Sequence, residues 1–224
     1  MAGDPLVEAA ETDDAVERAR LLLSLRQRGI RDRLVMNAFE QVPRDRFIEP
    51  VMHRIAWIDQ ALPIDCGQTI SQPTVVALMT DALDLLPAHS VLEVGTGSGY
   101  HAAILAHIAR RVVSVERFRS LATAAAARLR ELGLANVEVA VADGLKGYPL
   151  RAPFDRIVLS AAVSEVPAAL FDQLEPEGVL VAPIGPPEDT QTLVRFTRGR
   201  EGVERRDLAR VRFVPMLPGI AAVL

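Results

Sequence analysis

Cysteine is nearly absent from this sequence of 224 residues, and the single Cys66 excludes both an internal disulfide and a zinc site built from thiolates. The four histidines show no ligand spacing, so we predict no metal site. No apolar run approaches the roughly 20 residues that span a bilayer, and the acidic N-terminal segment lacks the apolar core of a secretory signal. We therefore expect a cytoplasmic protein with no membrane partner.

A strong charge of one sign is also lacking. The formal net charge is −4, which argues against a nucleic acid as partner. Half of the residues are hydrophobic, which excludes a disordered chain, but only 4% are aromatic, so the core must come mainly from Ala, Val, Leu and Ile. Because no Gly/Ser-rich linker divides the chain, we expect one domain over residues 1–224. We also expect the protein to act as a monomer.

The first third of the chain has helical patterns. Residues 12–14 offer an N-cap for a helix that stops at Gly29, and a second helix is predicted over residues 32–41. We therefore expect residues 1–65 to form a helical cap on an α/β core, residues 66–224.

From residue 90 onward, short apolar strands alternate with helices. The strands are predicted over residues 90–95, 111–116, 136–144, 154–162 and 179–185, with helices over 100–110, 117–133 and 167–178, and a final strand–turn–strand over 193–215. The alternation implies parallel βαβ units, and the flanking helices imply a sheet covered on both faces. The predicted fold is α/β: a doubly wound, mostly parallel sheet with a helical N-terminal cap and a C-terminal antiparallel strand pair.

Three glycines at every second position follow the first of these strands. Residues 93–99 read E-V-G-T-G-S-G, and Gly95, Gly97 and Gly99 permit a tight turn with close backbone approach to a ligand. The spacing is not the G-x-G-x-x-G of dinucleotide sites, and no Tyr–Lys or His–Asp set is present, which argues against an NAD-dependent oxidoreductase. A glycine turn alone can also be a plain connection between a strand and a helix.

Carboxylates stand at the ends of the neighbouring strands. Glu116 ends the second strand and suits the two hydroxyls of a ribose, and Asp143 with Gly144 ends the third strand at the same edge. Glu93, two residues before the first glycine, suits an ammonium group better than a pyrophosphate. The alternative is that these are ordinary loop carboxylates. As a set with the glycine turn, they resemble the S-adenosylmethionine site of the Rossmann-like methyltransferases.

Residues 61–73, A-L-P-I-D-C-G-Q-T-I-S-Q-P, carry the most specific motif. With V-L-E-V-G-T-G-S-G-Y, V-A-D-G, A-P-F-D-R-I-V-L-S-A-A and V-R-F-V-P, the segment is similar to the protein-L-isoaspartate O-methyltransferase family over nearly the whole chain. The resemblance implies a protein repair enzyme that transfers a methyl group from S-adenosyl-L-methionine to the free carboxylate of L-isoaspartyl residues in damaged proteins and peptides, leaving S-adenosyl-L-homocysteine. It also implies that Thr69, Ile70 and Ser71 line the cofactor pocket, with Ser71 at the position of the family's active-site serine.

Alternatives to this function stay open. Residues 160–167 read S-A-A-V-S-E-V-P where the family commonly has T-A-A-A-P-E-I-P, which leaves room for a related methyltransferase with a small-molecule acceptor. The other alternative is a non-catalytic module that binds isoaspartyl termini or a partner protein. The alternative for Ser71 is the N-cap of a helix that begins at Pro73. His101, which follows the glycine turn, is expected on the surface.

Overall fold

The described part of the computed structural model comprises residues 5–186 and 188–222, with side chains described from residue 14 onward. Its centre is a seven-stranded sheet in the order β5-β4-β3-β6-β7-β8-β9. The strands are β3 (Ser90–Val94), β4 (Arg111–Glu116), β5 (Val137–Val141), β6 (Phe154–Leu159), β7 (Leu174–Ile184), β8 (Gln191–Arg198) and β9 (Val203–Val211). β3 to β7 run parallel, whereas β8 and β9 add to the edge as an antiparallel pair. The predicted fold class is confirmed.

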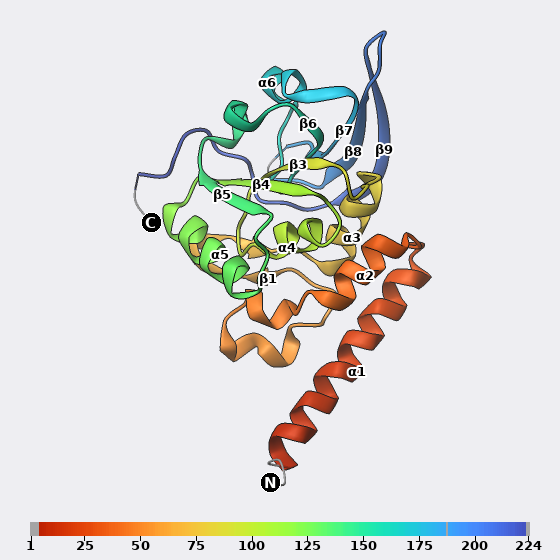
Figure 1. Cartoon of the computed structure of the whole chain (residues 1–224), viewed down its shortest axis with the longest axis vertical. Helices are drawn as coiled ribbons and strands as arrows, with labels where there is room; N and C mark the ends of the chain where they lie inside the picture. The colour runs from red at the N-terminus through yellow and green to blue at the C-terminus, as the bar shows by residue number, and fades with distance from the viewer. Residues whose placement is uncertain (1–4, 187, 223–224) are drawn as a thin grey trace.

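Helices cover both faces of this sheet (Figure 1). They are α3 (Pro73–Ala82), α4 (Tyr100–Ala106), α5 (Arg119–Glu131) and α6 (Ala168–Asp172). Successive strand side chains alternate between two hydrophobic clusters, so that Val91 packs on the α4 side and Leu92 on the α6 side. The strand order reverses between β3 and β6, which is where open α/β sheets bind ligands.

The N-terminal segment forms the predicted helical cap. It contains α1 (Pro5–Gln27), α2 (Arg33–Gln41) and the short 3-10 helices η1 (Arg44–Phe47) and η2 (Pro50–Ile55). α1 begins at Pro5, so its predicted start near residues 12–14 was wrong, and proline is tolerated in the first turn of a helix. The buried Trp57, whose ring centre lies 5.7 Å from the Arg18 guanidinium, shares a hydrophobic cluster with Ile104 of α4. Among the described residues no helix, α1 included, is long and apolar enough to cross a membrane.

A buried arginine fastens the cap to the core. Arg44 is fully buried, and its guanidinium lies 4.7 Å from the ring centre of Tyr100, the first residue of α4. It donates from Nε to the carbonyl of Ala56 (2.9 Å) and from Nη2 to that of Gln60 (3.3 Å). A buried cation needs such acceptors, because it has lost its water. Arg44 therefore holds residues 56–60 against the core.

A small hairpin connects the cap to α3. Its strands, β1 (Leu62–Pro63) and β2 (Thr69–Ile70), are antiparallel, with the 3-10 helix η3 (Asp65–Gly67) between them. Neither strand was predicted, because two residues are too few to show an alternating pattern.

The helix predicted over residues 167–178 is wrong in its second half. α6 ends at Asp172, and β7 begins at Leu174, which pairs with Phe154 of β6. The backbone N–H of Phe154 donates to the carbonyl of Gln173 (2.8 Å). Pairing with a distant strand therefore overrides the local helical pattern of these residues.

Candidate functional site

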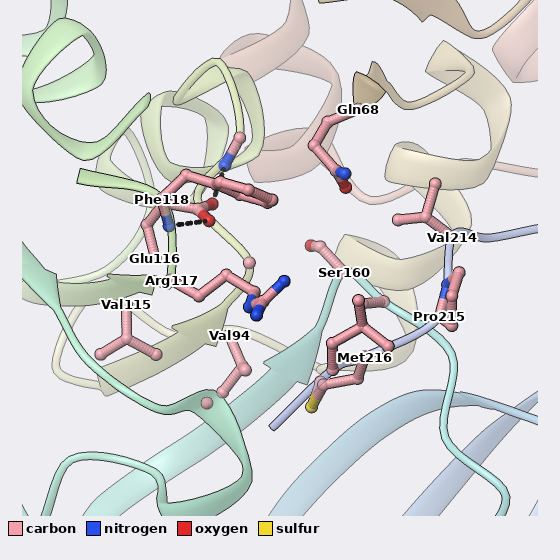
Figure 2. A pocket seen from close by; sticks show the side chains of 15 residues that line it. Gln68, Val94, Val115, Glu116, Arg117, Phe118, Ser160, Val214, Pro215 and Met216 are labelled. Carbon is pink, nitrogen blue, oxygen red and sulfur yellow. Dashed lines mark hydrogen bonds between the residues drawn. The ribbon is translucent and has the colours of Figure 1, made fainter. Parts of the chain in front are cut away.

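A pocket lies at the carboxyl ends of β3, β4 and β6, the edge at which open α/β sheets bind ligands. Figure 2 shows Glu116 and Phe118 on one side, Gln68 and Val214 on the other, and Ser160 between them. The remaining wall residues are Val94, Gly95, Gly97, Val115, Arg117, Gly144, Ala161, Pro215, Met216 and Leu217.

The glycine turn brings main chain rather than side chains to this pocket. Gly95, Gly97 and Gly99 have φ values of +99°, +52° and +90°, which residues with a Cβ rarely adopt. A Cβ at Gly95 would also lie 3.4 Å from the Cβ of Ser160. Gly95 and Gly97 line the pocket, whereas Gly99 precedes α4 and lies close to Ala125 of α5.

Glu116 joins the glycine turn to the end of β4. Its Oε2 accepts from the backbone N–H of Gly97 (2.9 Å), and its Oε1 accepts from that of Phe118 (3.0 Å). Each oxygen keeps a further lone pair, so the carboxylate can still accept hydroxyl groups from a ligand. Glu116 therefore lies at the pocket edge, as predicted, and these two hydrogen bonds fix its side chain in place.

Asp143 and Gly144 were both predicted at the pocket edge, but only Gly144 lines the pocket. The Oδ1 atom of Asp143 accepts from the backbone N–H of Leu145 (3.1 Å) and so caps the 3-10 helix η4 (Gly144–Lys146). Gly144 lines the pocket, and a Cβ there would lie 2.4 Å from Cγ1 of Val94, so a side chain at this position needs a local rearrangement. Asp143 is not part of the wall and sets the turn that presents Gly144.

Glu93 lies behind the glycine turn, not on the pocket wall. Its carboxyl is fully buried on the α4 side of the sheet, where Oε2 accepts from the Ser114 hydroxyl (2.5 Å). The Ser114 hydroxyl is also 2.6 Å from that of Thr96, inside the turn. Among the described residues Oε1 has no hydrogen-bond partner. The contact predicted between Glu93 and an ammonium group stays a prediction.

His101 is buried beside Glu93, so its expected surface position was wrong. Its Nδ1 lies 3.8 Å from Oε1 of Glu93, and its Nε2 lies 3.1 Å from the Thr80 hydroxyl. Burial raises the pKa of Glu93 to about 8 and lowers the pKa of His101 to about 3. Both side chains are therefore mainly uncharged at neutral pH, and together they form a neutral polar network under the turn. Within the described ranges, no group of three or more His, Cys, Asp or Glu side chains is arranged to hold a metal ion.

The hairpin meets the pocket through Gln68. This side chain lines the wall, and its Nε2 donates to the Cys66 carbonyl (3.1 Å). Of the three neighbours predicted to line the pocket, Thr69 is exposed, Ile70 is buried in the α4-side cluster and Ser71 is half-buried, and none of them belongs to the wall. Gln68 was missed as a site residue, although it lies within the G-Q-T-I-S segment.

Ser71 is half-buried and precedes α3, but it does not cap that helix. The N-cap residue is Gln72, which makes no capping bond with its side chain. Asp59 instead accepts from the backbone N–H of Thr74 (2.9 Å) and from its hydroxyl (2.7 Å). No hydrogen bond of the Ser71 side chain is found within residues 14–186 and 188–222. The alternative in which Ser71 is an N-cap is therefore wrong.

The chain returns after β9 to form the last wall of the pocket. The backbone N–H of Ala162 donates to the Val214 carbonyl, and that of Met216 donates to the Ala162 carbonyl, both at 2.8 Å. Farther on, Arg117 donates from Nε to the Gly219 carbonyl (3.3 Å). The wall residues that this returning segment contributes, 214–217, were also missed as site residues. The only signal for them was the V-R-F-V-P motif, which includes Val214 and Pro215.

The comparisons with known proteins agree with each other. The family model described as "Protein-L-isoaspartate(D-aspartate) O-methyltransferase" matches residues 16–220. A protein-L-isoaspartate O-methyltransferase from Xanthobacter autotrophicus is 56% identical over 211 residues, covering 94% of this chain and 96% of the relative. Protein-L-isoaspartate O-methyltransferase 2 from Rhodopseudomonas palustris strain HaA2 is 57% identical over 208 residues, covering 93% and 96%.

Solved structures give the same result. A protein-L-isoaspartate O-methyltransferase superposes with a TM-score of 0.81 at 29% identity, over 91% of this chain and 67% of the other. A beta-aspartate methyltransferase from Plasmodium falciparum, in complex with S-adenosyl-L-homocysteine, superposes with a TM-score of 0.76 at 28% identity, over 88% and 97%.

Proposed function

The chain belongs to the protein-L-isoaspartate(D-aspartate) O-methyltransferase family, and we propose that it binds its methyl donor in the pocket at the glycine turn and its acceptor beside the adjoining hairpin. It transfers a methyl group from S-adenosyl-L-methionine to the free carboxylate of L-isoaspartyl residues in damaged proteins and peptides. The match over nearly the whole chain argues against the two alternative functions, a methyltransferase with a small-molecule acceptor and a non-catalytic binding module. The observation that carries the proposed site is that Gln68 of the hairpin and Gly95 and Gly97 of the turn line one pocket.

The shape of the pocket supports this assignment of the cofactor site. The glycine turn leaves room for a ligand to approach the main chain, and the Glu116 carboxylate can accept the two hydroxyls of a ribose. Phe118, Met216 and Leu217 offer apolar walls to a flat base. Gly144, at the same edge, completes the proposed set of contacts, with Glu93 and Asp143 supporting the turns from behind. When bound, S-adenosyl-L-methionine supplies a methyl group activated by a positively charged sulfur.

The acceptor needs orientation more than activation. A free α-carboxylate has a pKa near roughly 3.5 and is ionised at neutral pH, so no strong general base is required. We propose that the hydroxyl of Ser71 donates to one carboxylate oxygen and thereby directs the other toward the methyl group. The N-terminus of α3, which follows Ser71, favours the same negative charge. Thr69 and Ile70 act by holding the hairpin in register, since neither is on the pocket wall.

We propose that residues 1–224 act as a single domain, a cap of residues 1–65 on a cofactor-binding core of residues 66–224, and the hydrophobic cluster shared by Trp57 and Ile104 supports this. We further propose that the protein acts as a monomer in the cytoplasm, without a nucleic-acid or membrane partner. Size-exclusion chromatography with light scattering tests the monomer.

A pair of matched peptides tests the function. The enzyme is expected to methylate an isoaspartyl peptide and not the corresponding aspartyl peptide, measured with a labelled methyl donor.

Ser71→Ala is expected to lower kcat for the isoaspartyl peptide about tenfold or more, because the carboxylate loses its orientation. The affinity for S-adenosyl-L-homocysteine should stay within about twofold, by titration calorimetry. Ser24→Ala, the same change at a half-buried serine of α1, is the control. Equal losses of turnover and of cofactor affinity in Ser71→Ala would contradict the role of Ser71.

A further inference from the structure

We infer that Asp59 is a positioning residue of the acceptor site, which caps α3 from a distance and so leaves the Ser71 hydroxyl available to the acceptor carboxylate. The inference rests on the proposed function, since it takes Ser71 as the group that meets the acceptor. It concerns a carboxylate of the cap, outside every motif that points to the family.

The first turn of α3 is capped by a residue that lies far from it in the sequence. Oδ1 of Asp59 accepts from the backbone N–H of Thr74 (2.9 Å), and Oδ2 accepts from the Thr74 hydroxyl (2.7 Å). Thr74 is the second residue of α3, and this is an N–H that a capping side chain ordinarily bonds. A serine at the N-cap position usually supplies that bond, but the N-cap of α3 is Gln72, whose side chain makes no such bond. Asp59 supplies it instead, and the Ser71 hydroxyl, one residue earlier, is not engaged by the helix.

The same two residues close the base of the hairpin. Asp59 stands just before residues 60–73, which contain β1, η3 and β2, and Thr74 stands just after them. The two hydrogen bonds between Asp59 and Thr74 therefore fix both ends of the segment that carries Ser71. Gln68, near the middle of the segment, lines the pocket. The Asp59–Thr74 bonds thus set where the acceptor segment meets the cofactor site.

Asp59 is itself held in place. Its side chain is only 19% exposed, and Nη2 of Arg28, at the end of the cap's first helix, lies 3.5 Å from Oδ2. On either side of Asp59, the carbonyls of Ala56 and Gln60 accept from the buried Arg44. A carboxylate fixed by its own loop and by a neighbouring cation can hold a helix terminus in one position.

Replacement of Asp59 tests the inference in the full-length enzyme. Asp59→Ala is expected to lower kcat/KM for an isoaspartyl peptide about tenfold to a hundredfold, because a small misplacement of a reacting group has effects of this size. The affinity for S-adenosyl-L-homocysteine should stay within about twofold. Asp59→Asn, whose amide oxygen can still accept one bond, is expected to recover part of the loss. Thr74→Val, which removes only the hydroxyl, should give a smaller loss in the same direction.

Asp32 offers a matched control. It caps α2 by accepting from the backbone N–H of Val35 (2.9 Å), so Asp32→Ala removes the same kind of bond elsewhere in the cap. This variant is expected to lose a similar amount of thermal stability and to keep kcat/KM for the peptide within about twofold. If Asp32→Ala lowers kcat/KM as much as Asp59→Ala does, the effect is a general loss of stability and the inference is overturned.

The double variant separates this inference from the function on which it rests. Because Asp59 acts through Ser71, the combined Asp59→Ala and Ser71→Ala enzyme is expected to be no slower than Ser71→Ala alone. Losses that multiply would show that Asp59 acts by another route, which overturns the inference and leaves Ser71 in its role. A Ser71→Ala enzyme with normal turnover would overturn the proposed role of Ser71 and the inference with it. If Asp59→Ala does not fold, Asp59→Asn and Thr74→Val are combined with Ser71→Ala instead, and the same two outcomes decide.

Discussion

The two sides of the pocket are built by different means. The glycine turn is held by local backbone geometry at Gly95 and by Glu116, which stands at the end of the adjacent strand. The hairpin opposite has two strands of only two residues each, and contacts from the cap, through Arg44 and Asp59, hold its position. Substitutions near the turn should therefore act on the cofactor, whereas substitutions in the cap should act on the acceptor.

The largest effect is expected at the glycine turn. Gly95→Ala places a Cβ on a residue with φ of +99°, 3.4 Å from the Cβ of Ser160. Backbone strain of this kind costs about 1–3 kcal/mol of folding stability. We also expect the affinity for S-adenosyl-L-homocysteine to fall by more than about tenfold, since a fall of 1.4 kcal/mol in binding free energy already gives that factor. Titration calorimetry and thermal unfolding measure the two effects.

Gly133 gives the control for this change. It follows α5 with φ of +73°, and a Cβ added there would meet no atom within 4 Å. Gly133→Ala should therefore lose stability through strain but keep its cofactor affinity. Equal losses of affinity in both variants would mean that affinity follows stability, and that the glycine turn has no direct role in binding the cofactor.

A smaller effect, seen through pH, is expected from the buried carboxyl under the turn. The pKa of Glu93 is about 8 in the folded protein, above the ordinary value of 4.5. Between these values the folded chain binds more protons than the unfolded one, so this contribution to stability is lost as pH rises, by at most about 1.4 kcal/mol per pH unit. Glu93→Gln cannot titrate and should gain stability relative to the native protein from pH 5 to pH 8, measured by urea unfolding.

His101 has the opposite pH dependence. Its pKa is lowered to about 3, so its contribution is present above its ordinary value of 6.5 and is lost as pH falls toward the folded value. Because Glu93→Gln keeps this histidine, the comparison of the two proteins isolates Glu93. A difference in stability that is flat from pH 5 to pH 8 would mean that Glu93 is already ionised in the fold.

The smallest effect is expected at the exposed end of the cap's contacts. The Arg28 side chain is 54% exposed, and exposed ion pairs contribute about 0.2–1 kcal/mol. Arg28→Ala should lower unfolding free energy within that range and change kcat/KM for the peptide by less than about threefold. Added salt should reduce the difference further. A loss as large as that of Asp59→Ala would mean that the ion pair, rather than the bonds to Thr74, positions the hairpin.

The glycine-turn side of the pocket was predictable because its signals lie in short stretches of sequence. Gly95 and Gly97 follow directly on a buried strand, and Glu116 ends the next strand, so the parallel fold alone brings them to one edge. The motif that carries Ser71 was equally recognisable, through its resemblance to the family. Its spacing did not decide whether that serine caps the following helix, because the helix has Gln72 as its N-cap residue and receives its capping bond from Asp59, which lies in the cap.

The features that escaped prediction depend on long-range pairing. Leu174 joins β7 by pairing with Phe154, against the helical pattern around it. Val214 reaches the pocket only because the chain reverses after β9 and bonds to Ala162. His101 looks like an ordinary polar residue at the start of a helix, and its burial depends on how α4 packs over β3. No local pattern encodes these contacts.

The position of Trp57, the chain's single tryptophan, makes the cap visible to spectroscopy. Its indole lies in the cap, two residues before Asp59, and it is not part of the pocket wall. Intrinsic fluorescence excited at the indole band is therefore emitted from the cap alone. Emission that shifts when a nucleoside ligand binds at the glycine turn would report motion passed on to the cap, without any attached dye.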